Sequence, residues 1–294
     1  MSPQHEPVLL AEALALLAPK PGDRAVDATL GLGGHAEAVL RATAPAGPLL
    51  GIDRDPEART RAQARLAAFG ARARIFAGNF VNLRRRLDDE GWDGADLLIA
   101  DLGVSSLQLD DPRRGFSWRA EAPLDLRMNP ESGSTAADLL DGMDERGFAD
   151  LLWKCGEEPK ARRIARAWFR LPREERPRTT TALADFVRRA SGYRPGRTHP
   201  ATRVFQALRI ALNDELGQLE ALLAQLPDLL APGGRAAVIS FHSLEDRRVK
   251  WSFRAAAAAG RLEILTKKPV VPGPDEAARN PRSRSAKLRA VRRP

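Results

Sequence analysis

Short apolar runs alternate with amphipathic stretches along the first hundred residues. The apolar runs predict four strands, over residues 24–28, 49–53, 74–77 and 96–101. Between them, apolar residues at helical spacing predict helices over 35–42 and 56–69. Strands that are apolar throughout and separated by helices are typical of a parallel sheet covered on both faces. The pattern therefore predicts an α/β fold with a doubly wound, Rossmann-like sheet.

The alternation stops after Ser106. No strand pattern is visible over residues 107–198, where apolar residues at helical spacing predict short helices instead. Two such stripes are Ile164, Trp168 and Leu171, and Leu183, Phe186 and Val187. We therefore predict a discontinuous sheet domain, residues 1–106 and 199–294, with a small helical insertion at 107–198.

After the insertion the sheet pattern resumes. A long amphipathic helix is expected over 202–230, ended by the Pro-Gly-Gly segment at 232–234. The rest of the chain predicts a strand over 235–241, a helix over 243–259, and two last strands over 262–266 and 286–291. The connection 268–285 is rich in proline and is expected to be a loop.

The composition is that of a globular protein from a reducing compartment. The chain has 294 residues, of which 43% are hydrophobic, and its one cysteine, Cys155, excludes an internal disulfide. That usage fits the cytoplasm. No run approaches the ~18 apolar residues of a membrane span, and no signal peptide is visible. We expect a cytoplasmic protein without a membrane partner.

The net positive charge is one indication of a binding partner. The formal net charge is +9, and between Glu158 and Ile210 fourteen basic side chains stand against four acidic ones. One interpretation is an arginine-rich composition on solvated helix faces. The other is binding to phosphates, since each phosphate that a cationic side chain neutralises releases counterions. The sequence leaves both open.

A glycine-rich turn follows the first strand. Residues 31–36 fit the dinucleotide pattern G-x-G-x-x-G/A, and Asp53 follows as a ribose acceptor. Asp27, however, ends the first strand, where its carboxylate would repel a pyrophosphate. It suits a cationic ligand, and S-adenosylmethionine carries a sulfonium and an ammonium group and no phosphate. Asp27 therefore favours S-adenosylmethionine over a dinucleotide.

The fourth strand ends in Asp101-Leu102-Gly103-Val104-Ser105-Ser106. An exocyclic base amine is a poor nucleophile, because its lone pair is delocalised into the ring. Acceptors that hold the N–H groups turn that lone pair toward a methyl donor. Asp101 or a nearby backbone carbonyl can serve. The D/N/S-P-P-Y/F signature of many amino methyltransferases is absent, so the sequence leaves the acceptor open.

The histidines predict no metal site. His5, His35, His199 and His242 are far apart in sequence and lack cysteine partners. His242 follows the predicted strand 235–241, where it suits a base, an RNA contact or a cap for the next helix. These interpretations stay open.

The chain resembles the bacterial ribosomal RNA small-subunit methyltransferase H (MraW) family over almost its whole length. The resemblance rests on these blocks, in order: His5–Leu10, Asp27–His35, Gly51–Pro56, Asp101–Asp111, Arg114–Ser117, Pro123–Met128, His199–Arg209, Ser240–Asp246 and Asn280–Leu288. It implies a class I S-adenosylmethionine-dependent methyltransferase that acts on N4 of a cytidine in the decoding region of 16S ribosomal RNA. It also implies that the helical insertion faces the RNA of the small subunit.

The same resemblance implies a set of cofactor contacts, namely Gly33, Gly34, His35, Asp53, Phe80, Asp101 and Gln108. Phe80 would pack against the adenine. Other hypotheses are an RNA-binding assembly factor with a vestigial cofactor pocket, and a methyltransferase acting on DNA or on N6 of adenine. The sequence also leaves the oligomeric state open, with a homodimer as one alternative.

Overall fold

The computed structural model describes residues 7–193 and 199–294, which fall into two compact units. The first comprises Met1–Gly103 and Leu216–Pro294, and the second Val104–Glu215. The predicted insertion therefore begins close to its predicted start but ends later than predicted. His5 lies outside the described residues, as do Arg194 and Arg197, two of the fourteen basic residues between Glu158 and Ile210.

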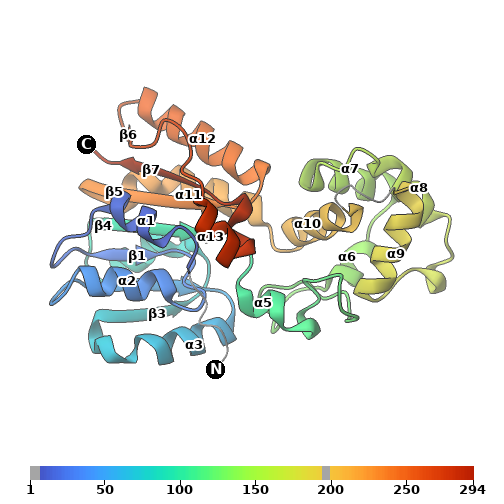
Figure 1. Cartoon of the computed structure of the whole chain (residues 1–294), viewed down its shortest axis with the longest axis horizontal. Helices are drawn as coiled ribbons and strands as arrows, with labels where there is room; N and C mark the ends of the chain where they lie inside the picture. The colour runs from blue at the N-terminus through green and yellow to red at the C-terminus, as the bar shows by residue number, and fades with distance from the viewer. Residues whose placement is uncertain (1–6, 194–198) are drawn as a thin grey trace. The chain divides into compact units, whose positions relative to one another are not determined.

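The first unit is built on a sheet of seven described strands in the order β3-β2-β1-β4-β5-β7-β6 (Figure 1). Their bounds are β1 Ala25–Asp27, β2 Leu49–Asp53, β3 Ala73–Ala77, β4 Ala95–Asp101, β5 Leu230–Ser240, β6 Glu263–Ile264 and β7 Lys287–Arg292. Neighbouring strands from β3 to β5 pair in parallel, and β7 runs antiparallel to both its neighbours. The predicted doubly wound α/β sheet is confirmed.

Helices cover both faces of this sheet. They are α1 Leu10–Leu17, α2 Gly34–Ala42, α3 Pro56–Leu66, α4 Leu83–Asp89, α11 Glu215–Leu229 and α12 Ser243–Ala258. A further short helix, α13 Pro274–Arg279, lies in the connection between β6 and β7 and buries none of its residues. Successive strand side chains point to opposite faces. Accordingly Leu49 packs in the core with α1, α2 and α3, whereas Leu50 packs in the core with α4, α11 and α12. The central strands β1, β2 and β4 are almost wholly apolar because both of their faces are buried, whereas the outer strands β3 and β6 are partly exposed.

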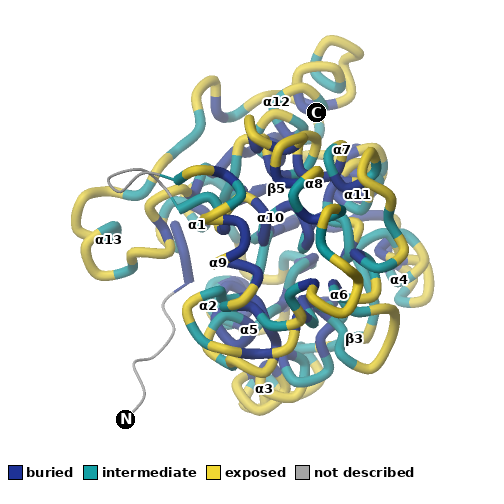
Figure 2. Tube along the Cα trace, turned by 90° about the vertical axis from the view of Figure 1, so that its right-hand side faces the viewer, coloured by how far each residue is buried: buried dark blue, intermediate teal, exposed yellow. Residues whose placement is uncertain are grey.

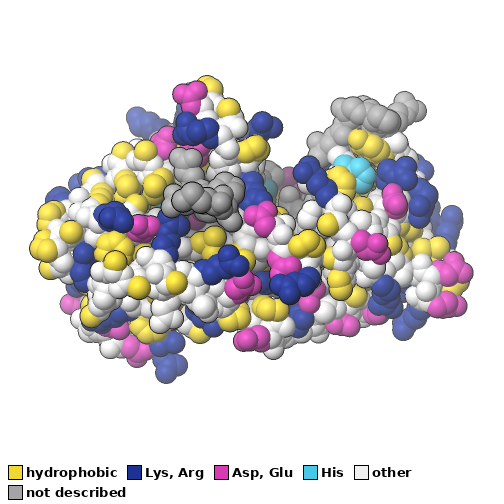
Figure 3. Space-filling view, turned by 60° about the horizontal axis from the view of Figure 1, so that its bottom comes forward, with side chains coloured by type: hydrophobic (Ala, Val, Ile, Leu, Met, Phe, Trp, Pro, Cys, Tyr) yellow, Lys and Arg dark blue, Asp and Glu magenta, His cyan; other side chains and the backbone are white. Residues whose placement is uncertain are grey.

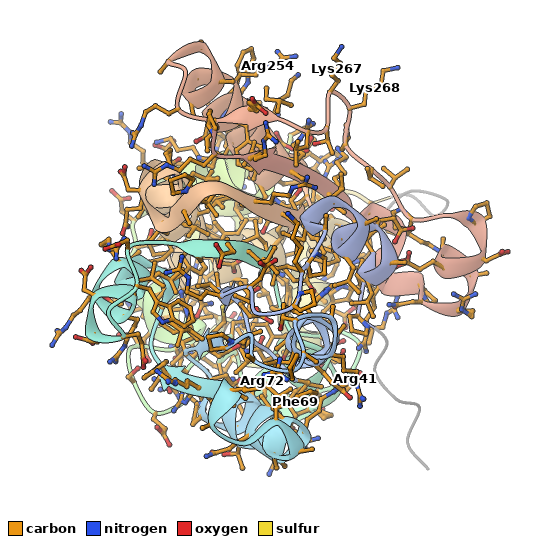
Figure 4. All side chains as sticks on the ribbon, turned by 90° about the vertical axis from the view of Figure 1, so that its left-hand side faces the viewer. Arg41, Phe69, Arg72, Arg254, Lys267 and Lys268 are labelled. Atoms are coloured by element: carbon orange, nitrogen blue, oxygen red, sulfur yellow. The ribbon has the colours of Figure 1, made fainter. Side chains whose placement is uncertain are left out.

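Two interactions of Arg72 fix the connection between α2 and β2. Its Nη2 donates to the Leu40 carbonyl oxygen at 2.6 Å, and its Nε donates to that of Gly47 at 2.9 Å. The guanidinium carbons of Arg41 and Arg72 lie 5.7 and 5.9 Å from the Phe69 ring centre (Figure 4). These contacts hold the end of α2, and hence the helix that starts at the glycine turn.

The second unit is helical. Its helices are α5 Ser106–Asp110, α6 Ala136–Asp141, α7 Glu145–Gly156, α8 Ala161–Phe169, α9 Thr180–Ser191 and α10 Pro200–Leu212. Trp168 anchors the core, with its ring centre 5.8 Å from Phe148 and 5.4 Å from Phe186. Buried positions recur along α9 and α10 (Figure 2).

In both units, no helix of the described chain is long and apolar enough to cross a membrane.

The single helix predicted over 202–230 is wrong. The chain instead forms α10 and α11, and between them Asp214 adopts a left-handed conformation with φ 49°. The Asn213 side chain accepts from the Met128 N–H at 2.8 Å and donates to the Leu126 carbonyl at 2.9 Å. Because α10 packs on α7 and α9, residues 199–215 belong to the helical unit and not to the sheet domain.

Two smaller predictions also need correction. The Pro-Gly-Gly segment does not end a helix, because α11 stops at Leu229 and residues 230–234 already belong to β5. The connection 268–285 is not wholly a loop, since it contains α13 and the 3₁₀ turn Pro281–Ser285. Glu276 of α13 accepts the Leu9 N–H at 2.9 Å. This bond ties the connection to the start of α1.

Candidate functional site

Three carboxylates lie where neighbouring parallel strands end. Asp27, Asp53 and Asp101 are the last residues of β1, β2 and β4. In the sheet register Asp27 stands opposite Gly51 of β2 and Ile99 of β4. The strand order reverses between β1 and β4, and open α/β sheets bind ligands at the carboxyl ends of the strands beside such a reversal. The sheet thus gathers the three predicted aspartates into one candidate site.

The glycine turn after β1 depends on its glycines. Gly31 and Gly33 have φ of 50° and 76°, a conformation that side chains with a Cβ adopt only with strain. At Gly34, the first residue of α2, a Cβ would lie 2.4 Å from Cγ of Pro7. The turn therefore needs glycine at 31 and 33 for its backbone conformation, and at 34 for the close approach of Pro7.

Asp53 orders this turn. Its two carboxylate oxygens accept the N–H groups of Gly31 and Asp55, each at 2.8 Å. Burial raises the pKa of Asp53 above its ordinary value, against the lowering effect of these two backbone donors. Each oxygen has a second lone pair, so the carboxylate retains the capacity to accept two hydroxyl groups.

Asp27 is almost completely buried, with 2% of its surface exposed. Burial raises the pKa of Asp27 to about 7, and the charges of Asp101 and Asp53 add to this effect, while His35 and the Thr29 N–H oppose it. The Thr29 N–H donates to Asp27 Oδ1 at 3.1 Å. The group therefore titrates near neutrality, and a cation bound beside it would favour its ionised form.

His35 and Asp101 face each other, with Nε2 of the imidazole 3.5 Å from Oδ2 of the carboxylate. Burial works against a charge on His35, but Asp101 and the charge of Asp27 raise the pKa of the imidazole above its ordinary value. Among the described residues, neither His35 Nδ1 nor Asp101 Oδ1 has a hydrogen-bond partner. Buried polar atoms are rarely left so, which points to a ligand that completes the site.

Sequence reasoning missed Thr29 and Glu276. The Thr29 hydroxyl accepts the Asp101 N–H at 2.6 Å, so this residue links β1 to β4. A threonine two residues after a strand-end aspartate was the available signal. Glu276 contributes to the raised pKa of His35. It is too distant in the chain for any sequence pattern to connect the two.

The remaining predicted cofactor residues have structural contacts of their own. Phe80 opens the 3₁₀ turn Phe80–Asn82 after β3 and packs, half-buried, against the core under α4. Gln108 lies in the helical unit, where its Oε1 accepts the Ser105 N–H at 3.1 Å and helps to cap α5. Their roles as cofactor contacts stay predictions.

His242 occupies the N-cap position of α12. Glu245 Oε2 accepts the N–H groups of Phe241 and His242 at 2.8 and 3.3 Å, and the imidazole Nε2 lies 3.2 Å from Glu245 Oε1. This geometry agrees with the interpretation of His242 as a residue at the helix start. Its roles as a base or an RNA contact stay untested.

Comparison with known proteins places the chain in a family. A family model described as the MraW methylase family matches residues 2–294. The chain belongs to the MraW methylase family. Its first unit accordingly has the predicted class I S-adenosylmethionine-dependent methyltransferase fold.

Proteins named ribosomal RNA small subunit methyltransferase H are similar to this chain over most of their length. The one from Thermomicrobium roseum is 48% identical over 308 residues, covering 100% of this chain and 94% of the relative. That of Geobacter sulfurreducens is 49% identical and covers 99% of both chains. That of Sorangium cellulosum is 50% identical over 99% of this chain and 91% of its own.

The buried Asp27 predicts a pH-dependent stability. A carboxyl whose pKa is higher in the folded chain than in the unfolded chain lowers stability as pH rises between the two values, here from 3.8 to about 7. Asp27→Asn removes this effect. Without added ligand, we expect the gain in unfolding free energy from this substitution to be about 2–3 kcal/mol larger at pH 8 than at pH 5.

Urea unfolding of both proteins at the two pH values measures this gain. Asp89→Asn, an exposed carboxyl on α4, is the matched control and should show no such difference. An equal gain at pH 5 and pH 8 for Asp27→Asn contradicts the assignment.

Proposed function

We propose that this protein transfers a methyl group from S-adenosylmethionine to the N4 amino group of a cytidine in the decoding region of 16S ribosomal RNA. The observation that carries the proposal is the group formed by the buried Asp27 and His35 and the partly exposed Asp101 beside the strand ends, where His35 and Asp101 have polar atoms without a hydrogen-bond partner among the described residues. Membership in a methylase family supports it. Relatives at 46–50% identity carry the name of a small-subunit ribosomal RNA methyltransferase.

The residues at the strand ends fit S-adenosylmethionine. The cofactor supplies a methyl group on a positively charged sulfonium. Asp27 lies where a carboxylate favours a cation and disfavours a phosphate. Asp53 retains lone pairs that can accept the ribose hydroxyls. In this proposal the glycine turn at Gly33 and Gly34 allows the backbone to approach the cofactor closely. Phe80 and Gln108 complete the proposed set of contacts, with Phe80 against the adenine.

Asp101 is the residue we assign to the amine. Its Oδ1 has no partner among the described residues and accepts an N–H of the cytosine amine in this proposal. That bond orients the nitrogen lone pair for attack. Methyl transfer would break the methyl carbon–sulfur bond of the sulfonium, whose electron pair would stay on the departing thioether sulfur. The new N–C bond would leave the nitrogen with one surplus proton, which Asp101 would receive. His35, 3.5 Å away, holds the carboxylate in place.

The helical unit supplies the RNA contacts in this proposal. Its exposed helix faces carry most of the basic residues between 158 and 210. A base inside a helix hides its amine, so the cytidine has to be turned out of its stack before it reaches Asp101. The site that acts on the base is thus acidic, while the surface that holds the RNA is basic.

The product identifies the function directly. Purified protein is incubated with methyl-labelled S-adenosylmethionine and small subunits that lack the modification, and the RNA is digested to nucleosides. We expect the label in N4-methylcytidine. Label in an adenosine or in a deoxynucleoside contradicts the base and the polymer proposed. No label, with the RNA still bound, identifies an assembly factor instead.

A second prediction concerns the cofactor. Asp53→Ala removes the acceptors for the ribose and for the Gly31 N–H, so we expect affinity for S-adenosylmethionine to fall by about 1–3 kcal/mol. Titration calorimetry measures it. Glu57→Ala, which removes a partly exposed carboxylate from α3, is the control and should bind like the wild type. An unchanged affinity for Asp53→Ala refutes the ribose contact.

A third prediction concerns Asp101. Asp101→Asn keeps the shape of the side chain but removes its capacity to take the amine proton. We expect the single-turnover rate at saturating cofactor and RNA to fall about 10²-fold or more. Asp89→Asn serves again as the exposed control. A rate within threefold of the wild type would exclude Asp101 as the proton acceptor.

A further inference from the structure

The basic stretch between residues 158 and 210 divides into two groups in the structure. Some of its arginines stabilise the fold: Arg209 pairs with Glu215 at 2.7 Å, and the buried Arg176 lies over the Phe169 ring at 4.7 Å. Others are exposed, and Lys and Arg side chains are prominent on the helical unit in Figure 3. The second group has a definite arrangement on α8 and α9.

Helix α8 has one apolar face and one face of arginines. Ala161, Ile164, Ala165 and Trp168 are buried, whereas Arg162, Arg163 and Arg166 are exposed, as is Arg170 at the C-cap. Arg162, Arg166 and Arg170 follow one another at steps of four residues. Because an α-helix rises 1.5 Å per residue, these steps place charges about 6 Å apart along the axis. The arginines therefore form a row and not a scatter.

This row forms one wall of a cavity of about 520 Å³ between α8 and α9. Arg189 lines it from α9, and Ala167 and Ala190 contribute small side chains to its lining. Arg163 reaches from α8 toward the end of α9. Its guanidinium lies 3.4 Å from the point that a Cβ atom at Gly192 would occupy. The cavity thus combines a row of cations with room for a chain to approach.

Most of the charges in this groove have no ion-pair partner within the described chain. No acidic residue lines the cavity. Of its five arginines, only Arg166 has a recorded ion pair, with Nε 4.0 Å from Glu145 Oε1, in the part of the chain that the structure describes. Like charges at helical spacing destabilise a helix. Because few acidic side chains offset the repulsion between these arginines, their arrangement favours the binding of an anionic ligand.

We propose that this groove, between α8 and α9, binds the phosphodiester backbone of the substrate RNA. The inference rests on the proposed function and adds to it a site outside the cofactor pocket. A row of arginines matches a ligand with repeated charges better than a single phosphate, and the planar guanidinium donates two parallel bonds to a phosphate. The groove holds the strand by charge and leaves the choice of base to the site at the strand ends.

A double variant tests the groove. Arg162→Gln with Arg189→Gln removes one cation from each wall, and neither residue has a recorded ion pair in the described chain. The control is Arg178→Gln with Arg188→Gln, which removes the same charge from the same unit. Those arginines pair with Asp141 at 2.6 Å and Asp185 at 3.2 Å. Equal melting temperatures establish that both full-length variants fold.

The probe is a fluorescein-labelled single-stranded RNA of about twelve nucleotides, and its affinity is measured by anisotropy at several salt concentrations. We expect the groove variant to bind about tenfold more weakly. The slope of log affinity against log salt should decrease by about 1.4, as two lost phosphate contacts require. The control should keep the wild-type slope.

Two results overturn the proposal: a groove variant with the affinity and slope of the wild type, or an equal loss in the control, which would show an effect of net charge alone. Failure of the proposed function has a different signature. In that case the wild-type protein transfers no labelled methyl group to the RNA, but the anisotropy measurement still shows that the groove binds RNA.

Discussion

The site depends on the burial of carboxylates at one edge of a parallel sheet. The three-residue strand β1 lies between β2 and β4, so Asp27 ends its strand two residues short of the register positions of Asp53 and Asp101, at the same edge of the sheet. Burial raises the pKa of Asp27 to about 7 and also raises the pKa of Asp53. Backbone N–H groups of the glycine turn and of Thr29 donate hydrogen bonds to these carboxylates and partly offset the free-energy cost of burying them. A cationic ligand would offset the remaining cost.

The two units separate two electrostatic tasks. The sheet unit gathers negative charge in a buried site, where the field of a carboxylate is weakly screened. The helical unit exposes positive charge on α8 and α9, where solvent stabilises each guanidinium and a polyanion can exchange with counterions. Arg-rich composition alone does not explain this second surface. Arg209 and Arg176 are used within the fold, whereas most of the groove arginines have no ion pair in the described chain, Arg166 with Glu145 excepted.

Local patterns predicted those parts of the fold that depend on neighbouring residues. The strand over 49–53 is found with the predicted bounds, because its apolar run is bounded by Pro48 and by Asp53. The long helix over 202–230 was wrong, since the apolar spacing continues without interruption while the backbone turns at Asp214. That turn is held by Asn213, whose partners Leu126 and Met128 come from a distant loop.

The sequence by itself determined the alternation of strands and helices, the aspartate at each strand end and the glycine turn, since each is a property of adjacent residues. Only the tertiary structure decided which side chains meet: His35 with Asp101, Thr29 with the Asp101 N–H, and Glu276 with the start of α1. It also joined the arginines of α8 and α9 into one groove. These pairings depend on strand order and helix packing, which local periodicity does not encode.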